Sequence, residues 1–405
     1  MIPPGRSWSH RVRVAGYHDL DGRPAFKLAM QEVGGRFYLY TGHLWHRGWS
    51  VLDVTDPGAP RLLRFVDGPA NTWTIQVQVA AGRMITSLEH IAPGWGGAPD
   101  DPSDEGMLIW DVSDPETPRR LGQFETEGGG THRNYYDGGR YVHLAAGMPG
   151  YAGNIYVIVD IADPSAPKEV ARWWVPGQWR EGGETGAPEA TSLHGGPYVE
   201  GDRAYLPYGG AGLVILDVSE ISRPRLVSRL PFSPPFQSFI AVHTAVPLPG
   251  RKLVSVNSEA IKEDCNEPLG FAGLVDVADE RAPRLHSLFP LPAAPEGAPF
   301  RNFCERGGRF GPHNQHQPQH QTVLLDRDDL VFLTYFNAGL RVVDIGDARQ
   351  PREVGWFVPP DPVVRRGELP TKLVAQSEDV LVDRRGHIYL TDKNHGLYVL
   401  RHDSL

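Results

Sequence analysis

Six short apolar runs along the chain end in Asp-Val or Asp-Ile, and a proline follows each aspartate at the same offset of seven residues. Consecutive aspartates are 49 to 68 residues apart. Apolar, β-branched runs bounded by turn residues predict strands, and a repeat of this length predicts a radial all-β array. The runs are WSVLDV, MLIWDV, YVIVDI, LVILDV, AGLVDV and LRVVDI, and their aspartates are Asp53, Asp111, Asp160, Asp217, Asp276 and Asp344.

Each repeat predicts four strands. In the third repeat we place them at residues 132–136, 141–145, 155–161 and 168–173, with tight turns at Asp-Gly-Gly-Arg and Ala-Asp-Pro-Ser. Four antiparallel strands joined in this way form an up-and-down propeller blade. The repeated aspartate has no catalytic role in this interpretation, because an Asx turn that accepts backbone N–H groups accounts for it.

The repeats predict a seven-bladed β-propeller that occupies residues 1–405 as a single domain. The seventh repeat runs from about residue 378 through HIYLTDKNHGLYVL and stops before its fourth strand. The segment RVRVAGY, within an N-terminal strand at about residues 10–17, resembles the fourth-strand segments PRLLRFV and PRLVSRL. We expect this strand to complete the last blade, since closing a ring removes an open sheet edge.

The runs LVILDV and YVIVDI, each followed by a turn and a proline at a fixed offset, resemble the LVIVD-repeat β-propeller family over almost the whole chain. This resemblance implies the propeller fold and indicates no reaction.

Composition narrows the function classes. The net charge is −9 with charges of both signs interspersed, so we expect no nucleic-acid partner. No signal peptide or membrane span is visible, which favours the cytoplasm. Cys265 and Cys304 fit no metal-binding motif and are expected to be free thiols, with a disulfide as the alternative. The oligomeric state is not indicated.

Candidate chemistry lies where the first strand of each blade begins, because these positions point into the mouth of the central channel. Four of the seven aligned positions are histidine, and a divalent cation would stabilise such a cluster. The alternative is that each histidine is a satisfied channel residue bonded to backbone or water. The aligned residues are Lys27, Thr74, His132, His194, His243, His320 and Glu378.

We therefore predict a divalent metal held by His132, His194, His243 and His320. Glu89, Glu259 and Glu378 are the candidates for orienting these ligands, since a ligating imidazole commonly passes its second N–H to a carboxylate. Four neutral ligands leave an octahedral ion two open positions, which favours Fe(II), with copper, manganese or zinc as alternatives. This arrangement is similar in architecture to carotenoid-cleavage-type non-haem iron oxygenases, without their sequence motifs.

The predicted function is oxidation, as by an oxygenase, of a small, partly apolar or aromatic organic substrate, with dioxygen as the expected co-substrate. Lys27, His313, His316 and Glu378 are the candidate catalytic residues. His313 and His316 precede His320 in GPHNQHQPQHQTV, and we expect them to act as a proton shuttle or a polar lid rather than as a second metal site. The alternatives are a lyase, isomerase or hydrolase that uses the metal as a Lewis acid, and a non-catalytic interaction scaffold.

Long loops on the same face carry many aromatic side chains, which suit an apolar or aromatic substrate or pack against one another. These residues are Trp95, Trp179, Phe232, Phe236, Phe239, Phe300, Phe303 and Phe310.

Overall fold

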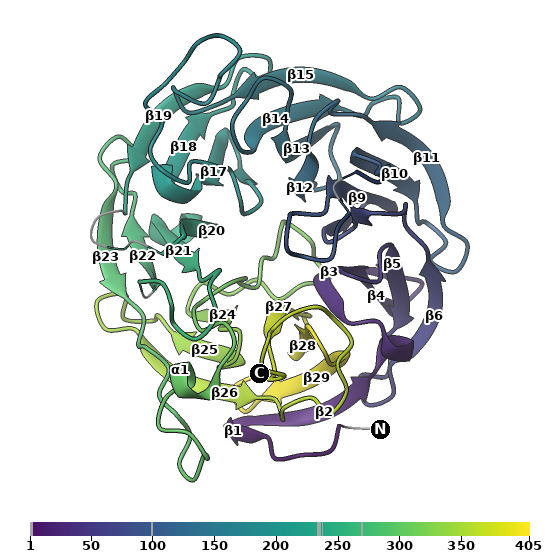
Figure 1. Cartoon of the computed structure of the whole chain (residues 1–405), viewed down its shortest axis with the longest axis vertical. Coiled ribbons are helices and arrows are strands. Elements are labelled where there is room, and N and C mark those ends of the chain that lie inside the picture. Colours follow the sequence, from purple (N-terminus) through teal and green to yellow (C-terminus); the bar gives the residue numbers. More distant parts are fainter. Residues whose placement is uncertain (1–2, 99, 233–235, 237, 269) are drawn as a thin grey trace.

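The chain folds as a β-propeller. The computed structural model describes residues 3–98, 100–232, 236, 238–268 and 270–405. Antiparallel four-stranded meanders stand radially around a central space, and the colour gradient of the chain follows the ring (Figure 1). One short α-helix, α1 (Phe303–Arg306), lies within the described ranges. No helix there is long and apolar enough to cross a membrane.

Within the described residues, five sheets have four strands each. Three of them come from single stretches of chain. The first is β3 (Ala25–Val33), β4 (Arg36–His43), β5 (Trp49–Asp53) and β6 (Arg61–Val66), and the second is β16 (Tyr198–Glu200), β17 (Arg203–Pro207), β18 (Leu213–Asp217) and β19 (Arg225–Leu230). A third is β20 (Ile240–Leu248), β21 (Leu253–Glu259), β22 (Ala272–Asp276) and β23 (Arg284–Leu288). The other two include N-terminal strands: β24 (Leu330–Thr334), β25 (Leu340–Asp344) and β26 (Arg352–Val358) with β1 (Trp8–His10), and β27 (Ser377–Val382), β28 (His387–Asp392) and β29 (Leu397–His402) with β2 (Val12–His18).

A nine-stranded sheet holds two further meanders. Its strands are β7 (Thr72–Trp73), β8 (Val77–Ala80), β9 (Arg83–His90), β10 (Gly106–Asp111), β11 (Arg119–Phe124), β12 (Gly130–Tyr135), β13 (Tyr141–Gly147), β14 (Ile155–Asp160) and β15 (Lys168–Trp173). A single residue pair, Gly130 with Glu89, joins β12 to β9. The two meanders, β8–β11 and β12–β15, are therefore joined into one sheet by this pair alone.

The N-terminal strand β2 pairs antiparallel with β29, the last strand of the chain. Its register skips one residue between Val14 and Gly16. Fourth strands elsewhere skip one residue at the same place, as β6 does opposite Val51 and Leu52 and β15 does opposite Ile158 and Val159. A β-bulge adds local twist. Because β2 shares this bulge, it is equivalent to the fourth strands of the other meanders.

The repeated aspartates form the expected Asx turns. Asp53 Oδ1 accepts a hydrogen bond from the Thr55 amide at 3.0 Å, and Asp160 Oδ1 accepts one from the Ala162 amide at 2.8 Å. The same contact to the residue two positions on is present at Asp111, Asp217, Asp276 and Asp344. The prediction that these carboxylates stabilise turns is therefore confirmed.

The apolar core lies between neighbouring blades. The cluster where the two ends of the ring meet packs Met30 and Leu39 of the β3–β6 sheet against Tyr389 and Val399 of the β27–β29 sheet. These side chains are buried because alternate residues of a strand point to opposite faces, and each face of a blade meets another blade.

Cys265 and Cys304 form a disulfide, which corrects the expectation of free thiols. Backbone contacts bring their two loops together: the Asp264 amide donates to the Gly308 carbonyl at 2.9 Å, and the Gly308 amide donates to Asp264 Oδ1 at 3.0 Å. The pairing depends on this proximity, which the spacing of the cysteines does not reveal.

Candidate metal centre

The innermost strands leave regular pairing where the candidate residues lie. The register shifts between Ala25 and Leu28 in β3, between Thr131 and Arg133 in β12, between Ile240 and Thr244 in β20, and between Ser377 and Val380 in β27. Bulges re-aim side chains, and they occur often beside functional sites. The irregular segments contain Lys27, His132, His243 and Glu378.

Four histidines come together at one mouth of the channel. The ring centroids of His132 and His194 are 4.2 Å apart, those of His194 and His243 are 5.5 Å apart, and those of His243 and His313 are 4.7 Å apart. Three of them are the predicted residues His132, His194 and His243. The fourth is His313, for which the sequence predicts a proton shuttle or a polar lid.

His320 lies outside this cluster, and this corrects the alignment of the repeats. Residues 313–316 take the innermost strand position beside β24, because the His313 amide donates to the Thr334 carbonyl at 3.0 Å and Gln315 pairs with Leu333. The chain between this segment and β24 runs to the opposite mouth. There His320 Nε2 lies 3.1 Å from the Val199 carbonyl, and its side chain is 41% exposed.

His316 is also outside the cluster, so the structure gives no support to its predicted catalytic role. Its Nε2–H donates to the Leu325 carbonyl at 2.7 Å, and its Nδ1 accepts from the Val382 amide at 3.1 Å. With both ring nitrogens bonded to backbone, His316 fixes the innermost segment to its neighbours. A cavity of about 470 Å³ at the opposite mouth is lined by His316 and His320.

Hydrogen bonds at Nδ1 fix the tautomers of three clustered histidines. His132 Nδ1–H donates to Glu89 Oε2 at 2.7 Å, His243 Nδ1–H donates to the His313 carbonyl at 3.2 Å, and His313 Nδ1–H donates to the Glu378 carbonyl at 2.9 Å. A proton on Nδ1 leaves the lone pair of a neutral imidazole on Nε2. Metal-bound histidines show this arrangement, in which the second nitrogen donates to a carboxylate or carbonyl.

The lone pairs at Nε2 converge on Glu259 at the end of β21. Glu259 Oε2 is 3.2 Å from His194 Nε2 and 3.4 Å from His243 Nε2, and Glu259 Oε1 is 3.5 Å from His313 Nε2. Ligand atoms of His194, His243 and Glu259 all lie within 4.8 Å of one another. Glu259, predicted to orient the ligands from behind, is thus itself a candidate ligand.

Three buried polar atoms at this point have no hydrogen-bond partner among the described residues: His132 Nε2, His243 Nε2 and Glu259 Oε2. A buried polar group without a partner costs free energy. Two lone-pair acceptors facing each other add electrostatic repulsion. A cation between these atoms removes both costs, and the donor set of imidazole and carboxylate suits a divalent transition metal.

The pKa values favour metal-binding forms of these groups. Burial lowers the pKa of His132 and His243 well below the usual value of 6.5, and burial also lowers that of His313, so all three are neutral near pH 7. Burial alone raises the pKa of Glu259, but its charged and hydrogen-bonding neighbours, Arg309 among them, outweigh burial and hold that pKa well below its usual value. Burial raises the pKa of Glu89 to about 7.

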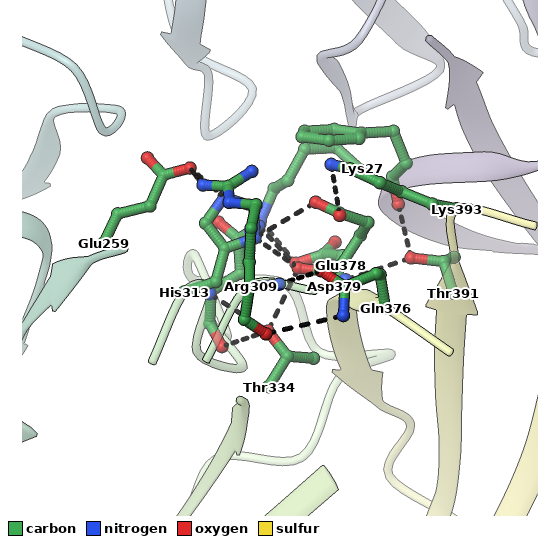
Figure 2. Close-up of polar contacts among 12 residues, drawn as sticks. Lys27, Glu259, Arg309, His313, Thr334, Gln376, Glu378, Asp379, Thr391 and Lys393 are labelled. Atoms are coloured by element: carbon green, nitrogen blue, oxygen red, sulfur yellow. Dashed lines mark hydrogen bonds and ion pairs between the residues drawn. The ribbon is translucent and has the colours of Figure 1, made fainter. Parts of the chain in front are cut away.

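Ion pairs behind the histidines complete the cluster (Figure 2). Glu378 Oε1 lies 2.5 Å from Lys393 Nζ, and Glu378 Oε2 lies 3.3 Å from His313 Nδ1. Lys27 Nζ donates to Asp379 Oδ1 at 2.8 Å. Arg309 binds Glu259 through Oε1 and so leaves Oε2 open. Lys27 and Glu378, predicted as catalytic, are buried in these pairs and orient other groups; neither lines the cavity described next.

A cavity of about 220 Å³ opens above the cluster. Its floor holds His132, His194, His313, Glu89 and Glu259, with the cationic side chains Arg133, Arg309 and Lys393. Its wall is apolar and includes Phe26, Trp73, Trp95 and Phe239. Two of the eight predicted loop aromatics, Trp95 and Phe239, therefore line the cavity, whereas Phe303 and Phe310 belong to the apolar core and Phe232 and Phe236 stack on Phe271.

Sequence reasoning missed the cations of this site. Arg133 directly follows His132, and a regular strand would point consecutive side chains to opposite faces. The bulge at this position allows both to line the cavity. Arg309 and Lys393 lie outside the strands, after α1 and after β28, where the repeat pattern carries no signal.

Comparisons with known proteins address the fold and not the reaction. A model of the LVIVD repeat matches residues 150–174 and 198–230. No curated protein is detectably similar in sequence. Among solved structures, the Cps50 (Swd1) β-propeller domain from Myceliophteria thermophila is 12% identical with a TM-score of 0.55, and the match covers 96% of this chain and 98% of that one.

Two further structures match at similar levels. U3-55K is 10% identical with a TM-score of 0.57 over 95% of this chain and 92% of that one. Sqt1 from Saccharomyces cerevisiae is 9% identical with a TM-score of 0.51 over 99% of both chains. At these identities the likeness shows the fold alone. The chain therefore carries LVIVD repeats within an all-β propeller fold.

Proposed function

We propose that this protein is a metal-dependent enzyme that binds one divalent ion at the mouth of the propeller channel and oxidises a small, partly apolar organic substrate there. His194, His243 and Glu259 hold the ion, and His132 and His313 adjoin it. The ring is proposed to have seven blades, with β8–β11 and β12–β15 counted separately.

One observation carries this proposal: buried Nε2 and carboxylate lone pairs face one point without partners, while the opposite nitrogens of the same imidazoles are fixed by hydrogen bonds. A structural histidine satisfies both nitrogens, as His316 does here. The four-histidine set expected from the sequence thus gives way to two histidines and one carboxylate, with two more histidines beside them.

Two histidines and one carboxylate with open positions form the ligand set of many non-haem Fe(II) oxygenases, so Fe(II) stays the first choice and dioxygen the expected co-substrate. The same ligands also hold catalytic zinc, which acts as a Lewis acid on carbonyl or phosphoryl oxygens. A hydrolase or lyase is therefore the second candidate, because His194, His243 and Glu259 fit zinc as well as iron. Oxygen uptake during turnover separates the two.

Metal analysis is the direct test. Protein purified without chelators and without a histidine tag is expected to hold about one equivalent of metal, as one site predicts. The variant His194→Ala/His243→Ala should lose it, because two of three ligands are gone. His320→Ala is the matched control, since this histidine lies at the opposite mouth, and it should retain the metal.

The scaffold alternative predicts the opposite result. A wild-type protein that holds no metal and takes up neither iron, copper, manganese nor zinc would overturn the proposed centre and leave an interaction scaffold as the better interpretation. Retention of the metal in the double variant would show that the ion sits elsewhere.

A further inference from the structure

The apolar cavity above the metal centre contains a buried arginine that makes no ion pair with any residue the structure describes. Arg133 is 2% exposed and lines the cavity, and its Nη1 has no hydrogen-bond partner among the described residues. Its guanidinium lies 5.1 Å from the centroid of the Phe26 ring. Burying an unpaired charge is costly, so a protein that keeps one there commonly uses it.

The carboxylates near Arg133 are already committed to other groups. Glu259 pairs with Arg309, Glu378 with Lys393, Asp379 with Lys27, and Glu89 with His132. Arg133 takes part in none of these pairs. Other buried arginines differ, since Arg309 also donates to the Ala260 carbonyl and Arg306 binds both Asp361 and the Pro359 carbonyl.

The charges around the cluster also favour an anionic ligand beside Arg133. Four carboxylates (Glu89, Glu259, Glu378, Asp379) and four cations (Lys27, Arg133, Arg309, Lys393) surround the cluster. A divalent ion added to this set leaves the site positive. An anion bound beside Arg133 neutralises part of that excess, and a carboxylate matches the fork of a guanidinium geometrically.

The cavity also limits the rest of the ligand. The rings of Trp73 and Trp95 meet edge to face with centroids 5.9 Å apart, and the rings of Trp95 and Trp45 stack with centroids 6.5 Å apart. The wall is therefore a packed aromatic corner. The volume is about 220 Å³. A cavity of about 150 Å³ accommodates benzene, so this one has room for a single ring with one substituent.

We infer that the substrate is a small aromatic carboxylic acid, whose carboxylate binds Arg133 while its ring packs against Phe26, Trp73 and Trp95. This inference rests on the proposed function for its reaction and names the substrate class of that site. The carboxylate lies between Arg133 and the metal centre, and this places the apolar body in the aromatic corner.

Binding of benzoate, phenylacetate and cinnamate by calorimetry tests the inference, with benzamide as the neutral analogue of benzoate. We expect at least one acid to bind wild type and benzoate to bind at least tenfold more tightly than benzamide. In Arg133→Met the acid should bind at least tenfold more weakly, as expected when a charged hydrogen bond is lost. Arg301→Gln, on an exposed loop, is the control and should bind as wild type does.

The stability of Arg133→Met is a second readout. Because Arg133 makes no hydrogen bond or ion pair with the described residues, its replacement should change the melting temperature little, and this separates a binding arginine from one that holds the fold. A large loss of melting temperature would overturn the assignment. So would equal acid binding by wild type and Arg133→Met, no binding of any acid at millimolar concentration, or tighter binding of phenyl phosphate than of each acid.

Metal content separates this inference from the proposed function. The titrations are carried out on protein as purified and again after chelator treatment, with the metal measured in both samples. Acid binding that depends on Arg133 in protein that never binds metal would support the inference and overturn the metal centre. A bound metal without Arg133-dependent acid binding would support the metal centre and overturn the inference about the substrate.

Discussion

Counting the partners of each ring nitrogen separates structural from functional histidines in this chain. His43 satisfies both nitrogens, with the Pro24 carbonyl at 3.0 Å and Ser50 Oγ at 2.8 Å. His132 and His243 each have one nitrogen bonded and one open. The sequence shows a histidine in all three places, and only the neighbours distinguish them. The proposed metal centre is based on this difference.

Buried histidines outside the site should make the fold sensitive to mild acid. Burial lowers the pKa of His143 to about 4, against the usual 6.5. The unfolded chain therefore takes up a proton below pH 6.5 that the folded chain refuses, and stability falls as the pH drops from 6.5 to about 4. For one such group the loss is about 3 kcal/mol.

The variant His143→Gln tests this at one site. It loses the 2.6 Å contact with the Tyr156 hydroxyl, so it should be less stable at pH 7. Its free energy of unfolding is measured with urea between pH 7 and 4. The slope of this free energy against pH should be smaller than that of wild type, by an amount that corresponds to close to one proton taken up on unfolding. The exposed His286→Gln serves as control. Parallel slopes for wild type and His143→Gln would contradict the prediction.

At the scale of elements, the repeat predicts second and third strands well and first strands poorly. Runs such as YVIVDI become β14 and its equivalents because both faces are buried and the following turn is fixed by an aspartate. The innermost strands carry the candidate site residues, and bulges interrupt them. Beside β24, residues 313–316 make only an isolated bridge and a few backbone bonds, so counting back from β24 selected His320 in place of His313.

The disulfide between Cys265 and Cys304 ties the loop after β21, the strand that ends at Glu259, to α1, the helix that precedes Arg309. The backbones of Glu263 and Arg309 also form an isolated β-bridge between these two segments. The disulfide therefore helps to hold the Arg309 guanidinium against Glu259. Disulfides persist in oxidising compartments, which is at odds with the cytoplasmic location expected from the sequence.

Thiol titration and the variant Cys304→Ser test the disulfide. Denatured, unreduced wild type should contain no free thiol. Cys304→Ser should lose up to about 4 kcal/mol of stability in guanidinium, because the bond closes a loop of 39 residues. Reduction of wild type should cause the same loss and should not affect the variant. Two free thiols in wild type would contradict the pairing.

At the scale of the molecule, stability depends on closing the ring between the two ends of the chain. Strand β2 seats against β29, and Gly16 at its bulge faces the Asp-Pro turn of the first blade. A Cβ at Gly16 would lie 2.2 Å from the Pro57 carbonyl oxygen. Gly122 repeats this contact between two other blades, where a Cβ would lie 1.9 Å from the Pro164 carbonyl oxygen. Both positions need a residue without a side chain, because the fourth strand of one blade packs there directly against the backbone of a turn in the next blade.

Ring closure can be tested by adding a side chain at Gly16, where β2 contacts the turn of the first blade. Gly16→Ala should cost about 1–3 kcal/mol, the range for overpacking, and Gly122→Ala should cost a similar amount. Gly250→Ala is the control, since a Cβ there has its nearest neighbour at 3.9 Å. Urea unfolding measures all three, and limited proteolysis reports whether β2 is released. If Gly16→Ala is as stable as wild type while Gly122→Ala is not, the N-terminal strand does not close the ring. If both lose stability and β2 becomes cleavable in Gly16→Ala alone, closure by the N-terminus holds the first and last blades together, as their shared apolar core requires.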